Sequence, residues 1–323
     1  MVRPPRIDQL LFKGTHNSYD AIHVVAPERQ VDDFGVWALE LDFSVLQGVA
    51  FIGHDGLGQG PDGDAVFEYA GSYRLRDYLM ALHSTEAFSY RPLMTFFDYH
   101  GRSDVDNNWG EDLPLVDVAE ILGAELTAVF PGQVFGPQRL QQAGGVLPPA
   151  RDLAGWVLAW GPGGTPNHPL VFGDTTSPFA ATYVEGCGAP RDGSGNPLPF
   201  RTLAGPQASR VWRLDNFTDE WTFRFGAPPN PIVVESASPD QTLVPPCDPD
   251  ANPLSIGREG TRLFPFSTLV DAVDAARQPL RYSDGQTFTD LLIGAGFTIL
   301  AAPGTYGDPF LVDFPLSIRA RAS

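Results

Sequence analysis

The stretch Trp37-Ala38-Leu39-Glu40-Leu41-Asp42-Phe43-Ser44-Val45 decides the fold. Apolar and small or polar residues alternate along it with the period of two that is typical of a β-strand. One face carries the large apolar residues, namely Trp37, Leu39, Leu41, Phe43 and Val45. The other face carries Ala38, Glu40, Asp42 and Ser44. The apolar face can pack against helices, so we expect the acidic face to point into a barrel or cleft, where two carboxylates need a cation or strong hydrogen bonds to remain ionised.

Three other apolar runs predict strands, at residues 10–12, 49–53 and 93–97. The last is almost continuously apolar, as expected of a strand buried on both faces. Residues that can do chemistry stand at or near the ends of these runs: His16, Asn17, His54 and Asp98. In a parallel barrel the carboxyl ends of the strands form one face, so we expect these side chains to meet Glu40 and Asp42 there.

Helical spacing separates the predicted strands. It is found from Tyr73 to Ser84 and from Leu115 to Val129. Further strands are predicted at residues 155–160, 210–214 and 231–235, with a long loop-like stretch from 161 to 205. Alternating strands and helices favour a parallel α/β arrangement. We therefore predict an α/β protein with a distorted (β/α)8 TIM-like barrel over residues 1–250.

The pattern changes towards the end of the chain. A short helix is predicted at residues 267–276, and two β-prone runs, 297–306 and 310–319, resemble the opening coil of a right-handed parallel β-helix. One coil cannot bury its own apolar face, because solenoids gain stability by stacking neighbouring repeats. We predict a β-rich segment over residues 255–323 that is separate from the barrel. The alternative is that this segment closes the barrel itself.

Composition limits the class of partner. The chain has 323 residues and a formal net charge of −18, which argues against nucleic acid as a partner because a polyanion would be repelled. Contact with a membrane surface is expected to be transient at most. No run approaches the roughly 18 to 20 apolar residues of a membrane-spanning helix, so no transmembrane segment is predicted. The 34 Gly and 31 Pro predict long irregular loops.

Two cysteines, Cys187 and Cys247, are too few for a protein zinc site without nearby histidines. They form either one disulfide or two unpaired thiols, since spacing alone does not decide whether they meet. The first residues lack the apolar stretch of a signal peptide. A secreted or extracellular location is favoured if such a peptide belongs upstream of this sequence, and a cytoplasmic one otherwise.

Four short motifs together resemble a known family. They are Gly14-Thr15-His16-Asn17-Ser18-Tyr19, Glu40-Leu41-Asp42, Gly53-His54-Asp55 and Phe97-Asp98-Tyr99-His100. In this order they are similar to the catalytic half of the phosphatidylinositol-specific phospholipases C, and most of all to the calcium-dependent branch. The resemblance covers about the first 100 residues and fades over the next 140. It implies a distorted (β/α)8 barrel and phosphodiesterase chemistry.

Transferred to this sequence, the resemblance implies that His16 and His54 are the catalytic pair. It also implies a metal held by Asn17, Glu40, Asp42 and Asp98. The residue types agree with this assignment, because calcium takes six to eight oxygen ligands from carboxylates, amide carbonyls and water. Convergent carboxylates without a cation would also repel one another and raise their own pKa values. We therefore predict calcium as the cofactor, with magnesium as the alternative.

The implied reaction is cleavage of a phosphodiester of the phosphatidylinositol type, in a lipid or its headgroup. The cation would bind a phosphoryl oxygen and the attacking hydroxyl. His54 would protonate the leaving alkoxide and His16 would act on the nucleophile or the phosphoryl group. The sequence departs from the family at Asp98, where glutamate is usual, and at His100, where lysine is common. The missing lysine argues against inositol rings that carry several phosphates.

Two other functions fit parts of the sequence. A glycerophosphodiester phosphodiesterase has the same barrel, and Glu40-Leu41-Asp42 followed by Gly53-His54-Asp55-Gly56 also resembles its motif. That family usually begins with His-Arg-Gly, whereas this chain has His16-Asn17-Ser18. A catalytically silent module that binds carbohydrate or a lipid headgroup is the third reading. It is motivated by the aromatic loops around Trp109, Trp156 and Trp160 and by the β-helix-like tail.

Overall fold

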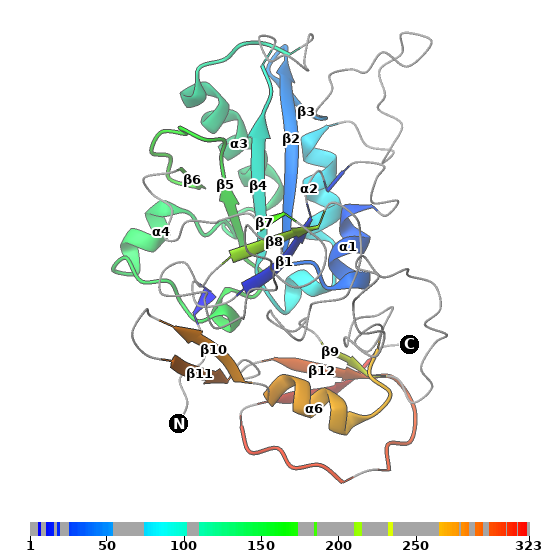
Figure 1. Ribbon diagram of the computed structural model, residues 1–323. Coiled ribbons are helices and arrows are strands. Elements are labelled where there is room, and N and C mark those ends of the chain that lie inside the picture. Colours follow the sequence, from blue (N-terminus) through cyan, green and yellow to red (C-terminus); the bar gives the residue numbers. More distant parts are fainter. Residues whose placement is uncertain are drawn as a thin grey trace, which may run out of the picture.

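The structure is a computed structural model (Figure 1). It describes residues 6–7, 11–15, 18–19, 26–53, 74–101, 110–173, 184–185, 210–214, 232–234, 265–277, 279–283, 288–292, 297–307, 309–314 and 316–321. Cys187, Cys247 and Trp109 lie outside these residues, so the two readings of the cysteine pair both stay open.

An eight-stranded sheet forms the centre of the described part. On one side of β1 (Leu11–Thr15) lie β2 (Ala38–Leu46), β4 (Leu93–Tyr99), β5 (Val157–Trp160) and β6 (Val171–Phe172). On its other side lie β8 (Arg210–Leu214) and β7 (Val184–Glu185). Neighbours along this path pair in parallel, and only β3 (Val49–Ile52) is antiparallel, in a hairpin with β2. Gln47 and Gly48 turn this hairpin with φ of 52° and 73°.

The strand order brings β1 and β8 side by side, as they would lie in a parallel barrel. The two ends of the sheet, β6 and β7, do not pair within the described residues, so no closed barrel is seen in that part of the chain. The predicted α/β class with a parallel sheet is confirmed. Closure of the sheet into a barrel stays a prediction.

Helices cover the outer face of the sheet (Figure 1). They are α1 (Pro27–Phe34), α2 (Leu75–His83) and α3 (Leu115–Val129). Their apolar stripes pack against the face of β2 that carries Leu39, Leu41, Phe43 and Val45. The sequence predicted α2 and α3 but not α1, which begins at Pro27 and ends before Gly35 in the left-handed region, φ 69°. Proline in the first turn and glycine after the last are common helix boundaries.

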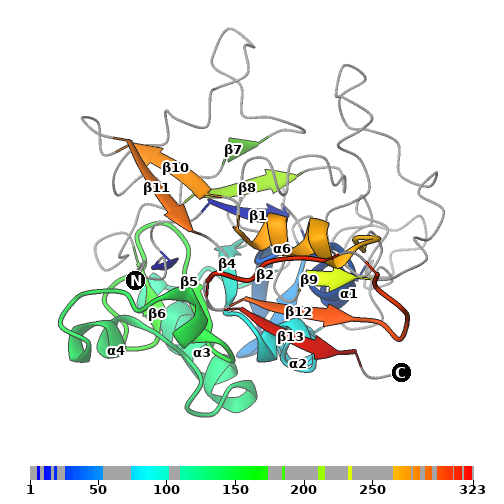
Figure 2. The same ribbon diagram turned by 90° about the horizontal axis from the view of Figure 1, so that it is seen from below.

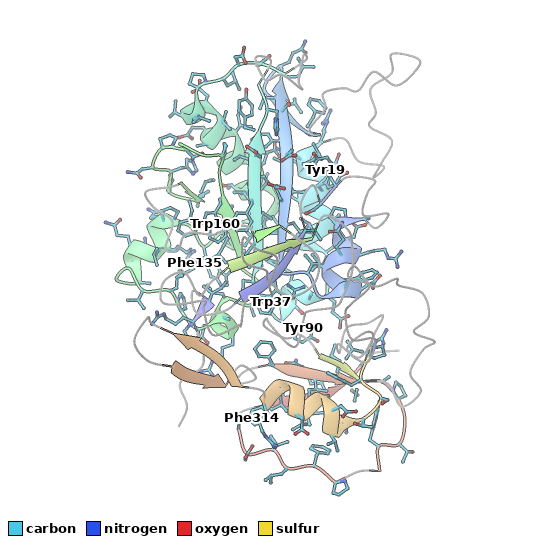
Figure 3. All side chains as sticks on the ribbon, in the orientation of Figure 1. Tyr19, Trp37, Tyr90, Phe135, Trp160 and Phe314 are labelled. Carbon is cyan, nitrogen blue, oxygen red and sulfur yellow. The ribbon has the colours of Figure 1, made fainter. Side chains whose placement is uncertain are left out.

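The inner face of the sheet holds a second, more aromatic core. Ala38, Met94 and Leu158 form one level of it, because they are register partners on β2, β4 and β5. The next level stacks Phe96 on Trp160, whose ring centroids lie 4.6 Å apart, and Trp160 on Phe172 at 5.4 Å. Trp160 is labelled in Figure 3.

Trp37 departs from the predicted alternation. It was expected beside Leu39 on the outer face, but it lies in the inner core. It precedes the first residue of β2, and its carbonyl accepts a hydrogen bond of 3.0 Å from the N–H of Met94 on β4. The guanidinium of Arg91 lies 4.9 Å from its ring centroid and donates hydrogen bonds to the carbonyls of Val31 and Val36. Burial lowers the pKa of Arg91 to about 9, which leaves the group charged at neutral pH.

Short elements complete the main sheet region. They are η3 (Ala87–Ser89), α4 (Pro137–Gln142) and η4 (Ala150–Leu153). The loop-like stretch predicted from residue 161 to 205 contains the two-residue strands β6 and β7. Two-residue strands have too few positions for a periodic pattern, so the sequence could not show them.

The remaining described elements form two small sheets and a helix. They are β9 (Ile232–Val234), α6 (Leu269–Arg277), β10 (Pro279–Ser283), β11 (Phe288–Leu292), β12 (Thr298–Ala301) and β13 (Ser317–Ala320). β12 pairs in parallel with both β9 and β13, while β10 and β11 form an antiparallel pair. α6 lies along β9 and β12 (Figure 2). Parallel pairing of β12 with β13 is the arrangement that a coil of a β-helix needs.

This C-terminal part contacts the main sheet region at the amino end of β2. The ring of Phe297 lies 6.3 Å from that of Trp37, and both belong to the inner core. β9 precedes the predicted boundary at residue 250 but pairs with β12, which follows it. The division into units at 1–250 and 255–323 stays a prediction.

The described helices are short. The longest, α3, has 15 residues, and none of those in the described part combines the length and apolar character needed to cross a membrane.

Candidate metal centre

Two predicted metal ligands, Asp42 and Asp98, lie opposite each other on neighbouring strands. They are register partners in the parallel pairing of β2 with β4. Asp42 is 2% exposed, whereas the side chain of Asp98 is 55% exposed at the edge of the site. Both stand near the carboxyl end of the paired part of the sheet, which is the upper end in Figure 1. A buried carboxylate beside a second one is costly unless a positive charge or hydrogen bonds compensate for it.

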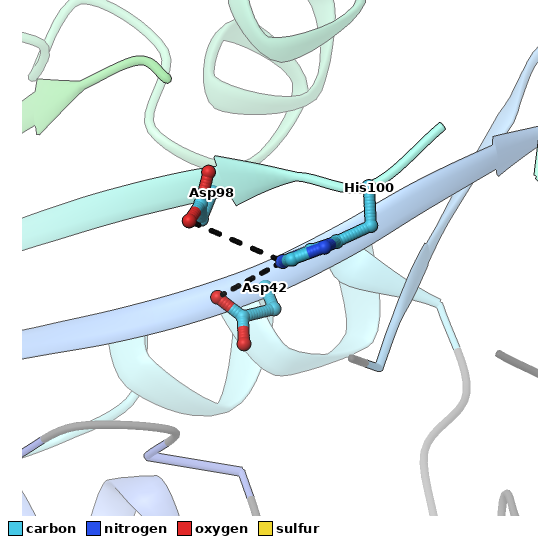
Figure 4. A group of neighbouring side chains, drawn as sticks. All are labelled: Asp42, Asp98 and His100. Carbon is cyan, nitrogen blue, oxygen red and sulfur yellow. Dashed lines mark ion pairs between the residues drawn. The ribbon is translucent and has the colours of Figure 1, made fainter. Parts of the chain in front are cut away.

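His100 completes the group. It follows β4 two residues after Asp98, so alternation directs both side chains to the same face. Its Nε2 lies 3.9 Å from Oδ1 of Asp42 and 4.0 Å from Oδ2 of Asp98 (Figure 4). Only 12% of its side chain is exposed. The three side chains together place two carboxylate oxygens and one imidazole nitrogen within 4.8 Å of one another.

Hydrogen bonds orient both carboxylates. Oδ2 of Asp42 accepts a hydrogen bond of 2.8 Å from the hydroxyl of Tyr19. Oδ1 of Asp98 accepts one of 3.0 Å from the backbone N–H of Tyr99. The other oxygen of each carboxylate is the one that faces Nε2 of His100. The donor atoms are thus turned towards a common point, as the ligands of a cation would be.

This donor set fits a divalent cation. Carboxylate oxygens suit calcium and magnesium, and a carboxylate pair with an imidazole also suits first-row transition ions. The spacing agrees as well, because the three donor atoms lie within 4.8 Å of one another and leave room for one ion between them. Asp42, Asp98 and His100 are the described residues that could hold it.

The segment after β1 is tied to the backbone of β2 beside Asp42. The N–H of Ser18 donates to the carbonyl of Glu40, and the N–H of Glu40 donates to Oγ of Ser18, both at 3.0 Å. Side-chain hydrogen bonds extend this contact to α1, where Nε2 of Gln30 donates to the carbonyl of Ser18 and Oγ1 of Thr15 donates to Oε1 of Gln30. These bonds fix the position from which Tyr19 reaches Asp42.

The loop after β4 is tied down by Tyr99. Its hydroxyl donates to the carbonyl of Glu111 and accepts a hydrogen bond of 3.0 Å from the N–H of Leu113. Burial raises the pKa of Tyr99, so the phenol remains a donor at neutral pH. This anchoring holds residues 110–113 beside the end of β4, where Gly110 packs against the carbonyl of His100.

The predicted site residues fall into three groups. Asp42 and Asp98 lie together, as the metal assignment requires. Glu40 is buried on the inner face one level lower, opposite Phe96, and is not among the three side chains whose donor atoms gather within 4.8 Å. Asn17, His16 and His54 lie outside the described residues, so their parts in the site stay predictions.

Two residues of this site had no predicted role. His100 belongs to the fourth motif, where it departs from a family pattern, and its spacing of two from Asp98 on a strand end indicates a shared face. Tyr19 belongs to the first motif, but nothing in the sequence indicates that its hydroxyl reaches Asp42.

Comparison with known proteins finds similarity among solved structures. A calcium-dependent phosphoinositol-specific phospholipase C from Pseudomonas sp. matches with a TM-score of 0.38 and 19% identity, over 49% of this chain and 59% of the other. The phosphatidylinositol-specific phospholipase C of Streptomyces antibioticus matches with 0.33 and 17%, over 48% and 53%. PLC21 of L. pealei matches with 0.33 and 19%, over 49% and 18%.

The matched region is about half of this chain and less than two-thirds of each of these structures. No family model and no curated protein matches the chain.

Proposed function

We propose that this protein is a metal-dependent phosphodiesterase of the phosphatidylinositol-specific phospholipase C type. The observation that supports it most is the convergence of Asp42, Asp98 and His100 at the carboxyl end of parallel strands. This is the edge where α/β sheets carry their active sites. The ordered motifs that contain these residues agree with the proposal.

In this proposal Asp42 and Asp98 hold the cation, with Asn17 and Glu40 as further oxygen ligands. When bound, the cation would polarise the phosphoryl group and lower the pKa of an attacking hydroxyl or water. Tyr19 keeps the Asp42 carboxylate in place through its hydrogen bond. His54 would donate the proton that the leaving alkoxide needs, and His16 would accept the proton of the nucleophile.

The proposed substrate is a phosphodiester that links a lipid or glyceryl group to an inositol-type headgroup. A ring hydroxyl beside the phosphate would attack phosphorus and release a cyclic phosphate. We further propose that the parallel sheet closes into a distorted (β/α)8 barrel. The alignment of β1 beside β8 supports this closure.

A panel of inositol, choline and glycerol diesters tests the proposal, run with calcium, magnesium, manganese or a chelator. We expect turnover of the inositol diester that the chelator abolishes, and a fall of at least about 100-fold in Asp42→Asn because the ligand charge is lost. Asp274→Asn is the matched control. It makes the same chemical change on α6, where Asp274 forms an exposed ion pair with Arg277 within the described part of the chain.

The products separate the alternatives. A cyclic phosphate indicates attack by an internal hydroxyl, whereas direct release of an open monoester from glycerol diesters would point to a glycerophosphodiester phosphodiesterase. Saturable binding of a headgroup or glycan without turnover under any cation would contradict the enzymatic proposal and favour a binding module.

A further inference from the structure

We infer that His100 is itself a ligand of the cation, so that the centre binds a first-row transition ion such as manganese or cobalt more tightly than calcium. The inference rests on the proposed function for the presence of a cation at this site. The inference goes beyond the proposed function because it names the third ligand and the class of metal. The sequence predicted an all-oxygen centre with Asn17 and Glu40 beside the two aspartates.

The position of the imidazole supports a ligand role. Nε2 is nearly equidistant from the two facing carboxylate oxygens, at 3.9 Å from Asp42 and 4.0 Å from Asp98. These separations are too long for direct hydrogen bonds, which join such atoms at about 2.7–3.2 Å. They leave room for one ion between the three donor atoms, which all lie within 4.8 Å of one another.

Hydrogen bonds hold the backbone of His100 in place, as they would hold a residue within a strand. Its N–H donates to the carbonyl of Phe43 at 3.0 Å, and its carbonyl accepts a hydrogen bond of 2.7 Å from Oγ of Ser44. Gly110 packs against this corner so closely that a Cβ there would lie 2.9 Å from the His100 carbonyl. The ring is therefore presented from a rigid position, which favours metal binding because little conformational freedom is lost.

Ligand chemistry gives the expected preference. Calcium and magnesium prefer oxygen ligands, whereas imidazole suits zinc, copper, iron and nickel, and affinity for mixed nitrogen and oxygen sites rises from manganese through cobalt. A centre of two carboxylates and one imidazole therefore gains more from a transition ion than from calcium. An imidazole that only lay beside an all-oxygen centre would give no such preference.

Calorimetry of the full chain with Mn²⁺, Co²⁺ and Ca²⁺ tests the inference without any substrate. We expect tighter binding of Mn²⁺ and Co²⁺ than of Ca²⁺. His100→Gln should weaken the binding of Co²⁺ and Mn²⁺ at least about 10-fold, since loss of even an outer partner of a ligand can have this effect. The affinity for Ca²⁺ should stay within about threefold of the parent's. The matched control is His83→Gln on α2, in the outer layer, where His83 contacts the rings of Phe88 and Phe130.

A spectroscopic measurement keeps the inference testable if His100→Gln does not fold. Pulsed electron paramagnetic resonance of Mn²⁺ bound to the unchanged protein reports nitrogen nuclei coupled to the ion. We expect such a coupling, and its loss in His100→Gln or His100→Ala wherever these variants fold. Calcium binding tighter than manganese, or a manganese signal without nitrogen coupling, would overturn the inference.

Failure of the inference and failure of the proposed function look different. A protein that binds manganese through His100 but cleaves no phosphodiester would keep the ligand assignment and reject the enzymatic function. Calcium-dependent cleavage that is unchanged in His100→Gln, with no nitrogen coupling, would keep the function and reject the ligand.

Discussion

The two faces of β2 are equally buried but chemically opposite. On the outer face Leu39, Leu41, Phe43 and Val45 are all fully enclosed by the helices. On the inner face Ala38, Glu40, Asp42 and Ser44 are no more than 7% exposed, yet two of them are carboxylates. Burial therefore does not distinguish the faces, and polarity does.

The difference separates residues that stabilise the fold from residues that cost stability for another purpose. Apolar side chains gain free energy from burial, whereas carboxylates lose hydration and repel each other. Asp42 is kept in place by Tyr19 and faces Asp98 and His100. Substitutions on the two faces should consequently have different effects, and four predictions follow this difference from the largest expected effect to the smallest.

Truncation on the outer face should have the largest effect on stability. Phe43→Ala removes a ring that contacts Phe97 and Tyr99, so we expect the free energy of unfolding to fall by about 3–5 kcal/mol. Phe43→Leu, which keeps most of the volume, should cost less than about 1.5 kcal/mol. Denaturant unfolding measures both. A small loss in Phe43→Ala would show that the outer face is not the main core.

Close packing in the outer layer makes a second prediction. In a helix, Gly→Ala normally stabilises by about 0.5–1 kcal/mol. At Gly123 of α3, however, an added Cβ would lie 2.4 Å from Cε1 of the buried His168. We therefore expect Gly123→Ala to destabilise the protein by about 1–3 kcal/mol, measured by thermal unfolding. Stabilisation by this change would mean that His168 can move away at little cost.

On the inner face, loss of a carboxylate charge should change the stability of the cation-free protein very little. Asp42→Asn removes repulsion from Asp98 and keeps an acceptor for Tyr19, so without cation stability should change by no more than about 1 kcal/mol. A cation at 100 times its Kd should stabilise the parent by about 2.7 kcal/mol and the variant much less. Equal stabilisation of both by the cation in thermal unfolding would contradict the metal assignment.

The smallest effect concerns a buried polar group away from the site. Nδ1 of His168 accepts hydrogen bonds from the N–H groups of Leu170 and Val171, and burial lowers the pKa of this histidine below its usual 6.5. As pH falls, His168 therefore takes up its proton at a higher pH in the unfolded chain than in the folded protein. The contribution of His168 to stability is complete above pH 6.5 and is lost as pH falls below it.

His168→Asn tests this contribution, because its amide oxygen can take the place of Nδ1. The variant should lose less stability than the parent between pH 7 and pH 5 in denaturant unfolding. Parallel pH profiles of the two proteins would show that His168 takes up its proton equally in the folded and unfolded states.

The long periodic elements of the fold were predictable from the sequence. The period-two pattern located β2, the apolar run after Pro92 located β4, and helical spacing located α3 with its observed ends. Elements of two or three residues, such as β6 and β9, were hidden or only roughly placed, because their existence depends on the partner strand. The inward position of Trp37 was missed for a similar reason, since tertiary contacts with Arg91 and Phe297 decide it.

The site was predictable in part. Asp42 and Asp98 were identified from their residue type and their places on predicted strands, and the register of β2 with β4 brings them together. Glu40 shares the face one level lower, as its spacing of two from Asp42 requires. Its partner on β4 is Phe96, which depends on a register that a sequence does not show. His100 and Tyr19 join the site through contacts between elements that are distant in the chain.

The sequence by itself determined which face of each long strand is apolar and which residues can bind a cation or move a proton, because these are properties of residue types and their local period. The tertiary structure alone decided which of those residues meet. Distances between side chains depend on strand register, on loops held by Tyr99 and Ser18, and on the direction of each carboxylate oxygen. These are set by long-range packing and hydrogen bonds, and no local pattern encodes them.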